Sequence, residues 1–174
     1  MQKELDAHIA RISESLSGSM PDIEKAAEII KTAKKSRGRV WTAGNGGSLT
    51  IAQHFAQDLI KSCGVDAQCL SDPSIITAYG NDEGFHRCFD GPLDILRRDN
   101  DAIVVFSCSG KSTNLLGLAV RFRHKMIAVT GTDGGMLKDY AGACIHSKSR
   151  DYDVCETAFS VAADLVIRKL KGAF

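Results

Sequence analysis

Two polar loops carry the residue types that hold a phosphate group in proteins. The first has the sequence GNGGS at residues 44–48, after the apolar run 40–43 and before a helical pattern. Its glycines allow a sharp turn, and Ser48 is a good N-cap for the helix. A strand, a glycine turn and a helix N-terminus leave backbone N–H groups pointing at one spot. This stretch therefore predicts an anion site.

The second loop, SCSGKST at residues 107–113, follows the buried run AIVVF at 102–106 and precedes an apolar helix. Hydroxyl and backbone donors at a helix N-terminus suit a phosphate monoester, and Lys111 could add positive charge. The alternative is a well-capped helix with a serine-rich turn. Two such loops in one sheet favour the phosphate site, with the hydroxyls of Ser107, Ser109, Ser112 and Thr113 as donors.

Neither loop is a nucleotide-binding motif. Gly110-Lys111-Ser112 looks like the end of a Walker A loop, but the glycine required five positions earlier is Val105. A dinucleotide fingerprint starting at Gly44 would need its third glycine at Leu49. We therefore expect no nucleotide cofactor.

His54 and Asp58 stand four residues apart on the helix after the first loop, so they share one face. They could act as an acid/base pair or as two metal ligands. A histidine with apolar neighbours such as Ile51 and Phe55 is more often structural, and that alternative stays open.

The cysteines and Asp82 are more simply interpreted as structural residues. Six cysteines occur without any C-x-x-C pair, which argues against a zinc ribbon and a disulfide framework. We expect reduced, buried thiols, and Cys108 and Cys155 are by default two of them. Asp82 stands in the segment 80–85, predicted to be a polar loop, where aspartate is more often a turn residue than a catalyst.

The elements that must position these groups alternate along the chain. Helical patterns at 2–17 and from about 22 to 35 precede five strands, at 40–43, 67–70, 102–106, 126–130 and 143–146, and a last helix covers 152–170. Strands that alternate with helices predict a doubly wound, mainly parallel five-stranded sheet in a three-layer αβα sandwich, with N-terminal helices added. Ligands bind such sheets at the carboxyl ends of the strands, where both polar loops fall.

Length and composition set the outer limits. A chain of 174 residues with 44% hydrophobic and 25% charged residues suits one globular domain. The net charge of +1, without a long single-sign block, does not favour nucleic-acid binding. No apolar run approaches the roughly 20 residues of a membrane span, and the N-terminus lacks a signal-peptide pattern. We expect a cytoplasmic protein with no nucleic-acid or membrane partner.

Four motifs with consistent spacing, from about residue 38 to 135, give the chain a family resemblance. The sequences AGNGGSLTIAQHFAQDL, TAYGNDEGF, FSCSGKSTNLL and AVTGTDGG resemble the sugar isomerase (SIS) domain, most closely its phosphoheptose isomerase branch. The resemblance implies a single SIS domain over 1–174, with helices at 1–37 for oligomerisation and a core at 38–174. It also implies a homotetramer with active sites between subunits.

The resemblance further implies an aldose–ketose isomerase that acts on a sugar phosphate such as sedoheptulose 7-phosphate through an enediol. Its substrate contacts and phosphate pocket would be formed by Asn45, Gly46, Gly47, Ser48, Asn81, Asp82, Ser107, Cys108, Ser109, Lys111 and Ser112. His54 would be a zinc ligand, and Asp58 stands where the family has a glutamate that serves as metal ligand and base.

Three positions depart from the family pattern. Asp58 is shorter than the family's glutamate by one methylene, roughly 1.5 Å, and a misplacement on that scale can cost about a hundredfold in rate. Cys155 aligns with a glutamine that binds zinc and substrate, and Ala163 with a histidine that is a ligand and acid/base group. A zinc held by His54, Asp58 and Cys155 remains possible, because catalytic zinc sites often have an open position. His124 and His146 are candidates for a replacement acid.

Three functional hypotheses follow. The first is a phosphoheptose-type isomerase with a modified site, in which Asp58 and His54 are catalytic. The second is an isomerase of the same fold for another sugar phosphate. The third is a non-catalytic phosphosugar sensor or interaction protein, which the alanine at position 163 favours.

Overall fold

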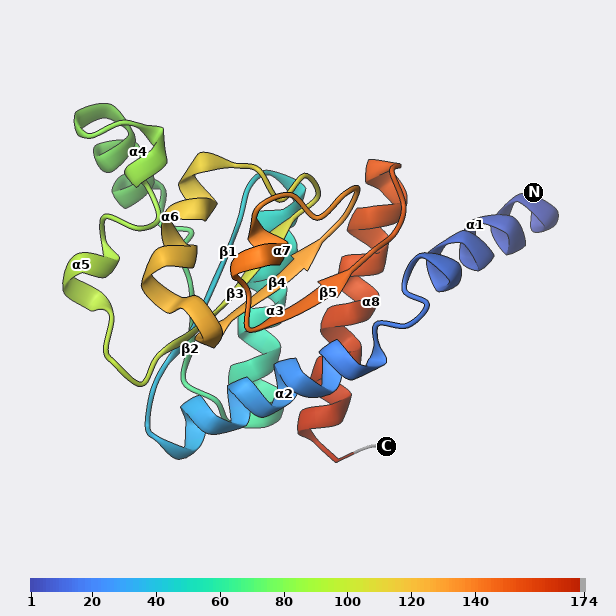
Figure 1. The fold of residues 1–174 in the computed structure, drawn as a ribbon, viewed down its shortest axis with the longest axis horizontal. Coiled ribbons are helices and arrows are strands. Elements are labelled where there is room, and N and C mark those ends of the chain that lie inside the picture. Colours follow the sequence, from blue (N-terminus) through green and yellow to red (C-terminus); the bar gives the residue numbers. More distant parts are fainter. Residues whose placement is uncertain (173–174) are drawn as a thin grey trace.

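Five apolar runs form one parallel sheet in the computed structural model, which describes residues 1–172 (Figure 1). The strand order is β2-β1-β3-β4-β5, and every neighbouring pair is parallel. The strands are β1 (Val40–Gly44), β2 (Ala67–Cys69), β3 (Ala102–Ser107), β4 (Met126–Thr130) and β5 (Ala143–His146). The predicted doubly wound fold and its five strands are confirmed.

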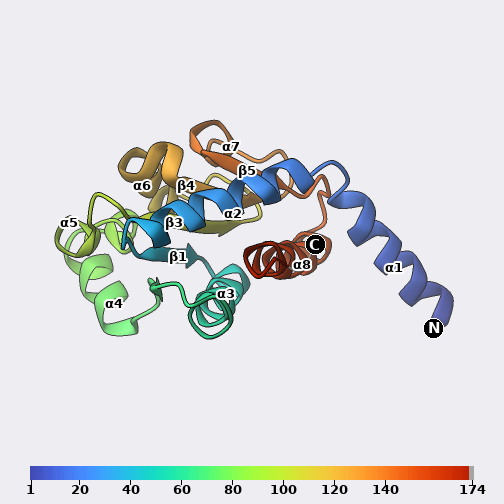
Figure 2. The same ribbon diagram turned by 90° about the horizontal axis from the view of Figure 1, so that it is seen from below.

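Helices cover both faces of this sheet (Figures 1 and 2). The chain contributes α1 (Gln2–Ser15), α2 (Met20–Lys35), α3 (Gly47–Cys63), α4 (Pro73–Asp82), α5 (Leu93–Leu96), α6 (Thr113–Phe122), α7 (Leu137–Tyr140) and α8 (Tyr152–Leu170), with single 3₁₀ turns at Phe85–Arg87 and Arg123–Lys125. One apolar cluster joins α2, α3 and α8 to the sheet, and a second joins α5, α6 and α7 to the opposite face. The predicted three layers are therefore present.

The alternation of side chains along the strands supplies both clusters. In β3, Val104 and Phe106 belong to the α2/α3/α8 side, whereas Ile103 and Val105 belong to the other. All are at most 2% exposed. Successive side chains of a strand point to opposite faces, so a continuous apolar run is what a strand buried on both sides requires.

Helix α1 extends from the body of the molecule (Figures 1 and 2). Leu5 and Ile9, two members of its apolar stripe, are 51% and 55% exposed. The predicted helix is present, and its role in oligomerisation stays a prediction. No helix within residues 1–172 is long and apolar enough to cross a membrane.

Two local predictions were wrong. The segment 80–85 is not one polar loop, because residues 80–82 form the last turn of α4 and Phe85 begins a 3₁₀ turn. Asp72 starts α4 by accepting hydrogen bonds from the backbone N–H groups of Ser74 and Ile75. Ser48 is not an N-cap either: Gly46 occupies that position, and Ser48 is buried inside the first turn of α3.

Candidate functional site

The two polar loops meet at a cavity of about 170 Å³ beyond the carboxyl ends of β1 and β3. These strands are neighbours, and Gly44 pairs with Phe106, so the loops that follow them must lie side by side. The first turns of α8 close the third side. The lining residues are Asn45, Ser48, Phe106, Ser107, Cys108, Ser109, Ser112, Tyr152 and Glu156.

Hydrogen bonds inside the loop 107–113 fix its shape. The hydroxyl of Ser107 accepts from the N–H of Gly110 at 3.1 Å, and that of Ser109 accepts from the N–H of Lys111 at 3.2 Å. Gly110 has φ of +63°, and a Cβ there would lie 1.9 Å from the carbonyl oxygen of Gly134. The loop thus needs glycine at this position.

Ser112 occupies the N-cap of α6, but its hydroxyl makes no capping hydrogen bond. The first N–H groups of a helix lack partners within the helix and carry its positive dipole end. The hydroxyl of Ser112 and the start of α6 can therefore both bind an anion in the cavity.

A reciprocal amide pair ties the two loops together. Asn45 donates from Nδ2 to Oδ1 of Asn114 at 3.1 Å, and Asn114 donates from Nδ2 to Oδ1 of Asn45 at 2.9 Å. Asn114 is 1% exposed, and its Nδ2 also lies 3.5 Å from Sγ of Cys88. The sequence analysis missed Asn114, whose only signal was an amide at the start of the helix after the hydroxyl-rich loop.

Glu156 and Tyr152 of α8 were missed as well. Ideal Cβ geometry at Gly47 would place that atom 2.8 and 3.0 Å from the two carboxylate oxygens of Glu156. Glycine at position 47 therefore lets this carboxylate approach the first turn of α3. The available signal was the position of both residues in the first turns of a helix that begins at the carboxyl edge of the sheet.

Two buried cysteines, Cys108 and Cys155, lie at the cavity or close to it. Burial, with Cys155 and Glu156 nearby, raises the pKa of Cys108 to about 12. Cys155 is fully buried, and its thiol donates to the carbonyl oxygen of Ser149 at 3.3 Å. This thiol thus already has a backbone partner on the inner side of α8.

His54 and Asp58 lie outside the cavity. Nε2 of His54 is 3.4 Å from Oδ2 of Asp58, and the two side chains are 74% and 33% exposed. Asp58 follows Ser48 by ten residues, which is about 15 Å along a helix. Their predicted pairing on one helix face is observed, but the cavity lies at the other end of α3.

The residues expected to hold zinc do not fit a metal within one chain. Cys155 is buried under the sheet edge, whereas His54 points to solvent. Over residues 1–172, no group of three or more His, Cys, Asp or Glu side chains is arranged to bind a metal ion. The set His54, Asp58 and Cys155 is therefore not brought together within one chain.

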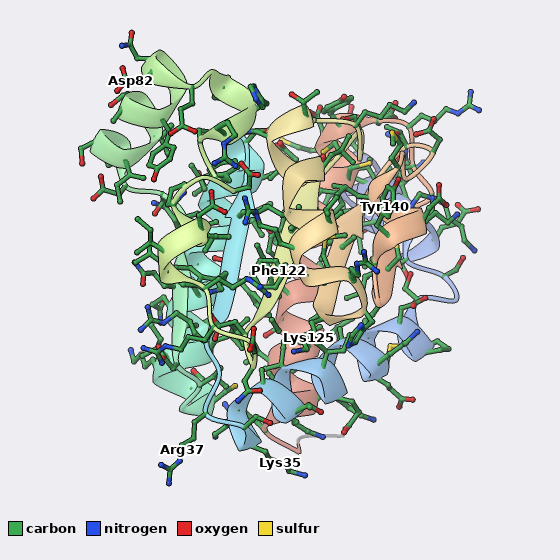
Figure 3. The ribbon with its side chains drawn as sticks, turned by 60° about the vertical axis from the view of Figure 1, so that its left-hand side comes forward. Lys35, Arg37, Asp82, Phe122, Lys125 and Tyr140 are labelled. Carbon is green, nitrogen blue, oxygen red and sulfur yellow. The ribbon has the colours of Figure 1, made fainter. Side chains whose placement is uncertain are left out.

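Three further expected contacts also point elsewhere. Nζ of Lys111 lies 2.7 Å from Oδ2 of Asp133, and both side chains are more than half exposed. Asn81 and Asp82 are exposed at the end of α4, and Asn81 donates to Asp82 at 2.8 Å. Figure 3 shows Asp82 at the outer end of α4, remote from Lys35 and Arg37 below the sheet.

Neither histidine named as a replacement acid lines the cavity. His124 lies near Ala102 at the amino ends of the strands, the opposite edge of the sheet. His146 ends β5, with its Nδ1 3.1 Å from the hydroxyl of Thr130, and burial lowers its pKa.

Comparisons with known proteins agree with this geometry. The sequence model of the SIS domain family matches residues 4–131. The phosphoheptose isomerase of Citrifermentans bemidjiense is 32% identical over 184 residues, which cover 98% of this chain and 95% of that protein. That of Geotalea uraniireducens is 34% identical over 186 residues, covering 99% and 98%.

Solved structures extend the agreement to the whole fold. The phosphoheptose isomerase from Neisseria gonorrhoeae is 30% identical with a TM-score of 0.84, and the match covers 98% of both chains. The one from Francisella tularensis is 25% identical with a TM-score of 0.88, covering 98% of this chain and 96% of that chain. Since both sequence and fold match over nearly the full length, this chain belongs to the SIS domain family, on its phosphoheptose isomerase branch.

Proposed function

We propose that this protein is a phosphosugar isomerase, which converts sedoheptulose 7-phosphate or a similar ketose phosphate into its aldose through an enediol. The observation that carries the proposal is the cavity in which the loops 44–48 and 107–113 meet. The near full-length likeness to phosphoheptose isomerases supports the reaction class.

The cavity supports phosphate binding through neutral donors. The hydroxyls of Ser107, Ser109 and Ser112 line it, and the start of α6 adds backbone N–H groups. A phosphate bound there leaves its sugar facing Asn45 and the first turn of α3. The amide of Asn45 and the N–H groups at that turn are suited to sugar oxygens, including the oxygen on which charge develops in an enediolate.

The remaining expected contacts belong to the proposal but not to the cavity of one chain. The other expected contacts would reach the substrate only in another conformation of the chain or from a second copy of it. They are Asn81, Asp82, Lys111 and the pair His54–Asp58. We further propose that the protein forms a homotetramer through its N-terminal helices. The exposed apolar residues Leu5 and Ile9 on α1 support it, and analytical ultracentrifugation tests it.

Zinc has no step in this proposal. When bound, zinc would polarise the sugar carbonyl as a Lewis acid. The buried, backbone-bonded thiol of Cys155 and the outward His54 do not support such a site.

One observation favours a second candidate, a phosphosugar-binding protein without catalysis. Ala163, at the position of the family's histidine, packs against the hydrophobic core, and a methyl group can neither ligate a metal nor transfer a proton. The phosphate cavity would be retained in such a protein.

A turnover assay separates the two candidates. Purified protein is incubated with sedoheptulose 7-phosphate, with and without added zinc, and the aldose product is quantified. Product formation that scales with enzyme concentration is the expected result. No product from this or a panel of other ketose phosphates at high enzyme concentration would exclude the isomerase. Thermal stabilisation by the same inactive compounds would then support the binding protein.

A further inference from the structure

A second cavity, of about 400 Å³, lies at the amino ends of the strands, opposite the loops 44–48 and 107–113. Its lining comes from α2 and from the turns that precede β3 and β4, within residues 25–36, 100–102 and 124–125. We propose that this amino-edge cavity binds a small molecule built of a flat ring and a phosphate group, such as a nucleoside monophosphate. The inference goes beyond the proposed isomerase function and does not depend on it.

The floor of the amino-edge cavity is apolar. Ala33 of α2 and Ala102 at the start of β3 are 4% and 1% exposed, and the half-buried Ile29 packs against the same core cluster. Because both alanines have short side chains, they leave room above the core. Ligand pockets have volumes of roughly 300–1,000 Å³ and combine apolar walls with a few polar groups. A flat ring can therefore bury one apolar face on this floor.

Two lysines line the amino-edge cavity from different elements, Lys25 from α2 and Lys125 from the turn before β4. Neither is among the lysines that form ion pairs within residues 1–172, and Nζ of Lys125 donates to the backbone carbonyl of Asp99. Glu28, the acidic residue among the described lining residues, already pairs with Lys31 at 2.8 Å. A phosphate monoester carries a charge of about −1.5 to −2 at pH 7, which suits two unpaired lysines.

The wider surface at this edge of the sheet is also basic. Figure 3 shows Lys35, Arg37 and Lys125 at the same end of the molecule, with Asp82 at the other end. Asp101 lies at the basic end too, but it is 1% exposed and its carboxylate already accepts three hydrogen bonds. A positive potential over a hollow raises the local concentration of anions. The surroundings therefore favour a phosphate over a neutral or cationic ligand.

Close contacts between backbone segments hold the rim of the cavity in place. Nδ2 of Asn100 donates to the carbonyl oxygen of Ser36 at 3.1 Å, and a Cβ at Gly38 would lie 2.0 Å from the carbonyl oxygen of Asn100. A Cβ at Gly142 would lie 1.9 Å from the carbonyl oxygen of His124. Only glycine permits such approaches. The cavity is therefore formed before a ligand arrives, which lowers the entropy cost of binding.

The turn before β4 presents an aromatic side chain to the cavity. His124 lines it and is exposed, so its imidazole is available to stack on a ring, as aromatic side chains do on nucleic-acid bases. The preceding Arg123 has φ of +45°, a backbone conformation that costs free energy for any residue except glycine. Strained backbone of this kind is concentrated at ligand sites. The turn thus supports a ring site beside the apolar floor.

Calorimetry on the full-length protein tests the proposal. Adenosine, guanosine, cytidine and uridine monophosphates are titrated separately, together with adenosine, which lacks the phosphate. We expect saturable binding of at least one monophosphate with a Kd below about 1 mM. Adenosine should bind at least about tenfold more weakly than its monophosphate, because the contacts to the lysines are lost.

Variants of the lining residues locate the binding. Lys25→Met and Lys125→Met each remove one charge at similar length and should each weaken monophosphate binding by at least about tenfold. Thr32→Phe adds an apolar ring at an exposed lining position and should block the cavity. Lys35→Met is the matched control, because Lys35 is an exposed lysine of the same helix that does not line the cavity. Its affinity should equal that of the wild type.

Ser112→Ala distinguishes this cavity from the one at the loop 107–113. Monophosphate affinity should be unchanged in this variant, whereas binding of ribose 5-phosphate, which lacks the ring, should fall in it and persist in Lys25→Met. Loss of monophosphate affinity in Ser112→Ala but not in Lys25→Met would overturn the inference, because the ligand would then occupy the loop 107–113.

Two further outcomes would overturn the inference. One is a wild type that binds none of the four monophosphates saturably. The other is an absence of binding together with a changed oligomeric state of Thr32→Phe in analytical ultracentrifugation, which would assign this face to a second copy of the chain. Turnover of a sugar phosphate is measured separately, so the isomerase proposal stands or fails independently of these results.

Discussion

Asn45 and Asn114 hydrogen-bond to each other in both directions, across the gap between the loops that follow β1 and β3. The pair makes the position of one loop depend on that of the other. Asn114 is 1% exposed, whereas Asn45 lines the cavity, so removing the amide of Asn114 leaves the amide of Asn45 without its fixed protein partner.

Asn114→Ala should therefore loosen the site as well as the fold. Two hydrogen bonds of about 1 kcal/mol each are lost. We therefore expect the free energy of unfolding, measured by urea denaturation, to fall by about 2 kcal/mol. We also expect a rise of about tenfold in the KM for the sugar phosphate, because Asn45 is no longer fixed. Asn100→Ala, which removes an exposed amide that bonds to the carbonyl of Ser36, is the matched control. Equal behaviour of the two variants would contradict a positioning role for Asn114.

Ser112→Ala should weaken phosphate binding without weakening the protein. The hydroxyl lines the cavity but makes no capping hydrogen bond, so its loss should leave the melting temperature nearly unchanged. One hydrogen bond to a charged phosphate contributes roughly 1.5–3 kcal/mol, which corresponds to a loss of at least about tenfold in affinity by calorimetry. Ser13→Ala on the exposed side of α1 should have no effect. A lower melting temperature with unchanged affinity would show that Ser112 serves the fold instead.

Cys108 should make the folded protein sensitive to alkaline pH. Its pKa is raised to about 12 by burial, whereas an unfolded thiol titrates near 9. The folded state therefore holds its proton more tightly, so the stabilisation is complete below pH 9 and is lost as the pH rises toward 12. Cys108→Ala should show a flatter decline of unfolding free energy over this window than the wild type. Identical slopes of unfolding free energy against pH in the two proteins would mean that burial does not raise the pKa of this thiol.

Asp101 should be essential to the edge of the sheet opposite the cavity. It is 1% exposed and accepts from Nε1 of Trp41 at 2.8 Å and from the N–H groups of Arg39 and Arg98 at 2.7 and 2.9 Å. Asp101→Ala leaves the buried indole N–H of Trp41 and two partly buried backbone N–H groups without this partner, so we expect a loss of about 3–5 kcal/mol in unfolding free energy. Asp99→Ala in the same exposed turn should change stability by less than about 0.5 kcal/mol. Comparable losses in both would contradict this account.

The sequence by itself determined the fold and one half of the site. Short continuous apolar runs bounded by glycine and polar residues are typical of strands buried on both faces, and their alternation with helices predicts a parallel sheet. Ligands of such sheets bind at the carboxyl edge, so the serine loop after Phe106 and the glycine loop after Ala43 were predictable as partners. Local patterns carry this information because it depends on spacing along the chain.

Only the tertiary structure decided which side chains share the cavity. His54 and Asp58 are neighbours on α3 by spacing, yet the helix carries them away from the phosphate loops at 1.5 Å per residue. Glu156, more than a hundred residues from Gly47, reaches it because α3 and α8 pack side by side on the same face of the sheet. Contacts between distant segments depend on how helices seat on a sheet, and no periodicity within either segment encodes that arrangement.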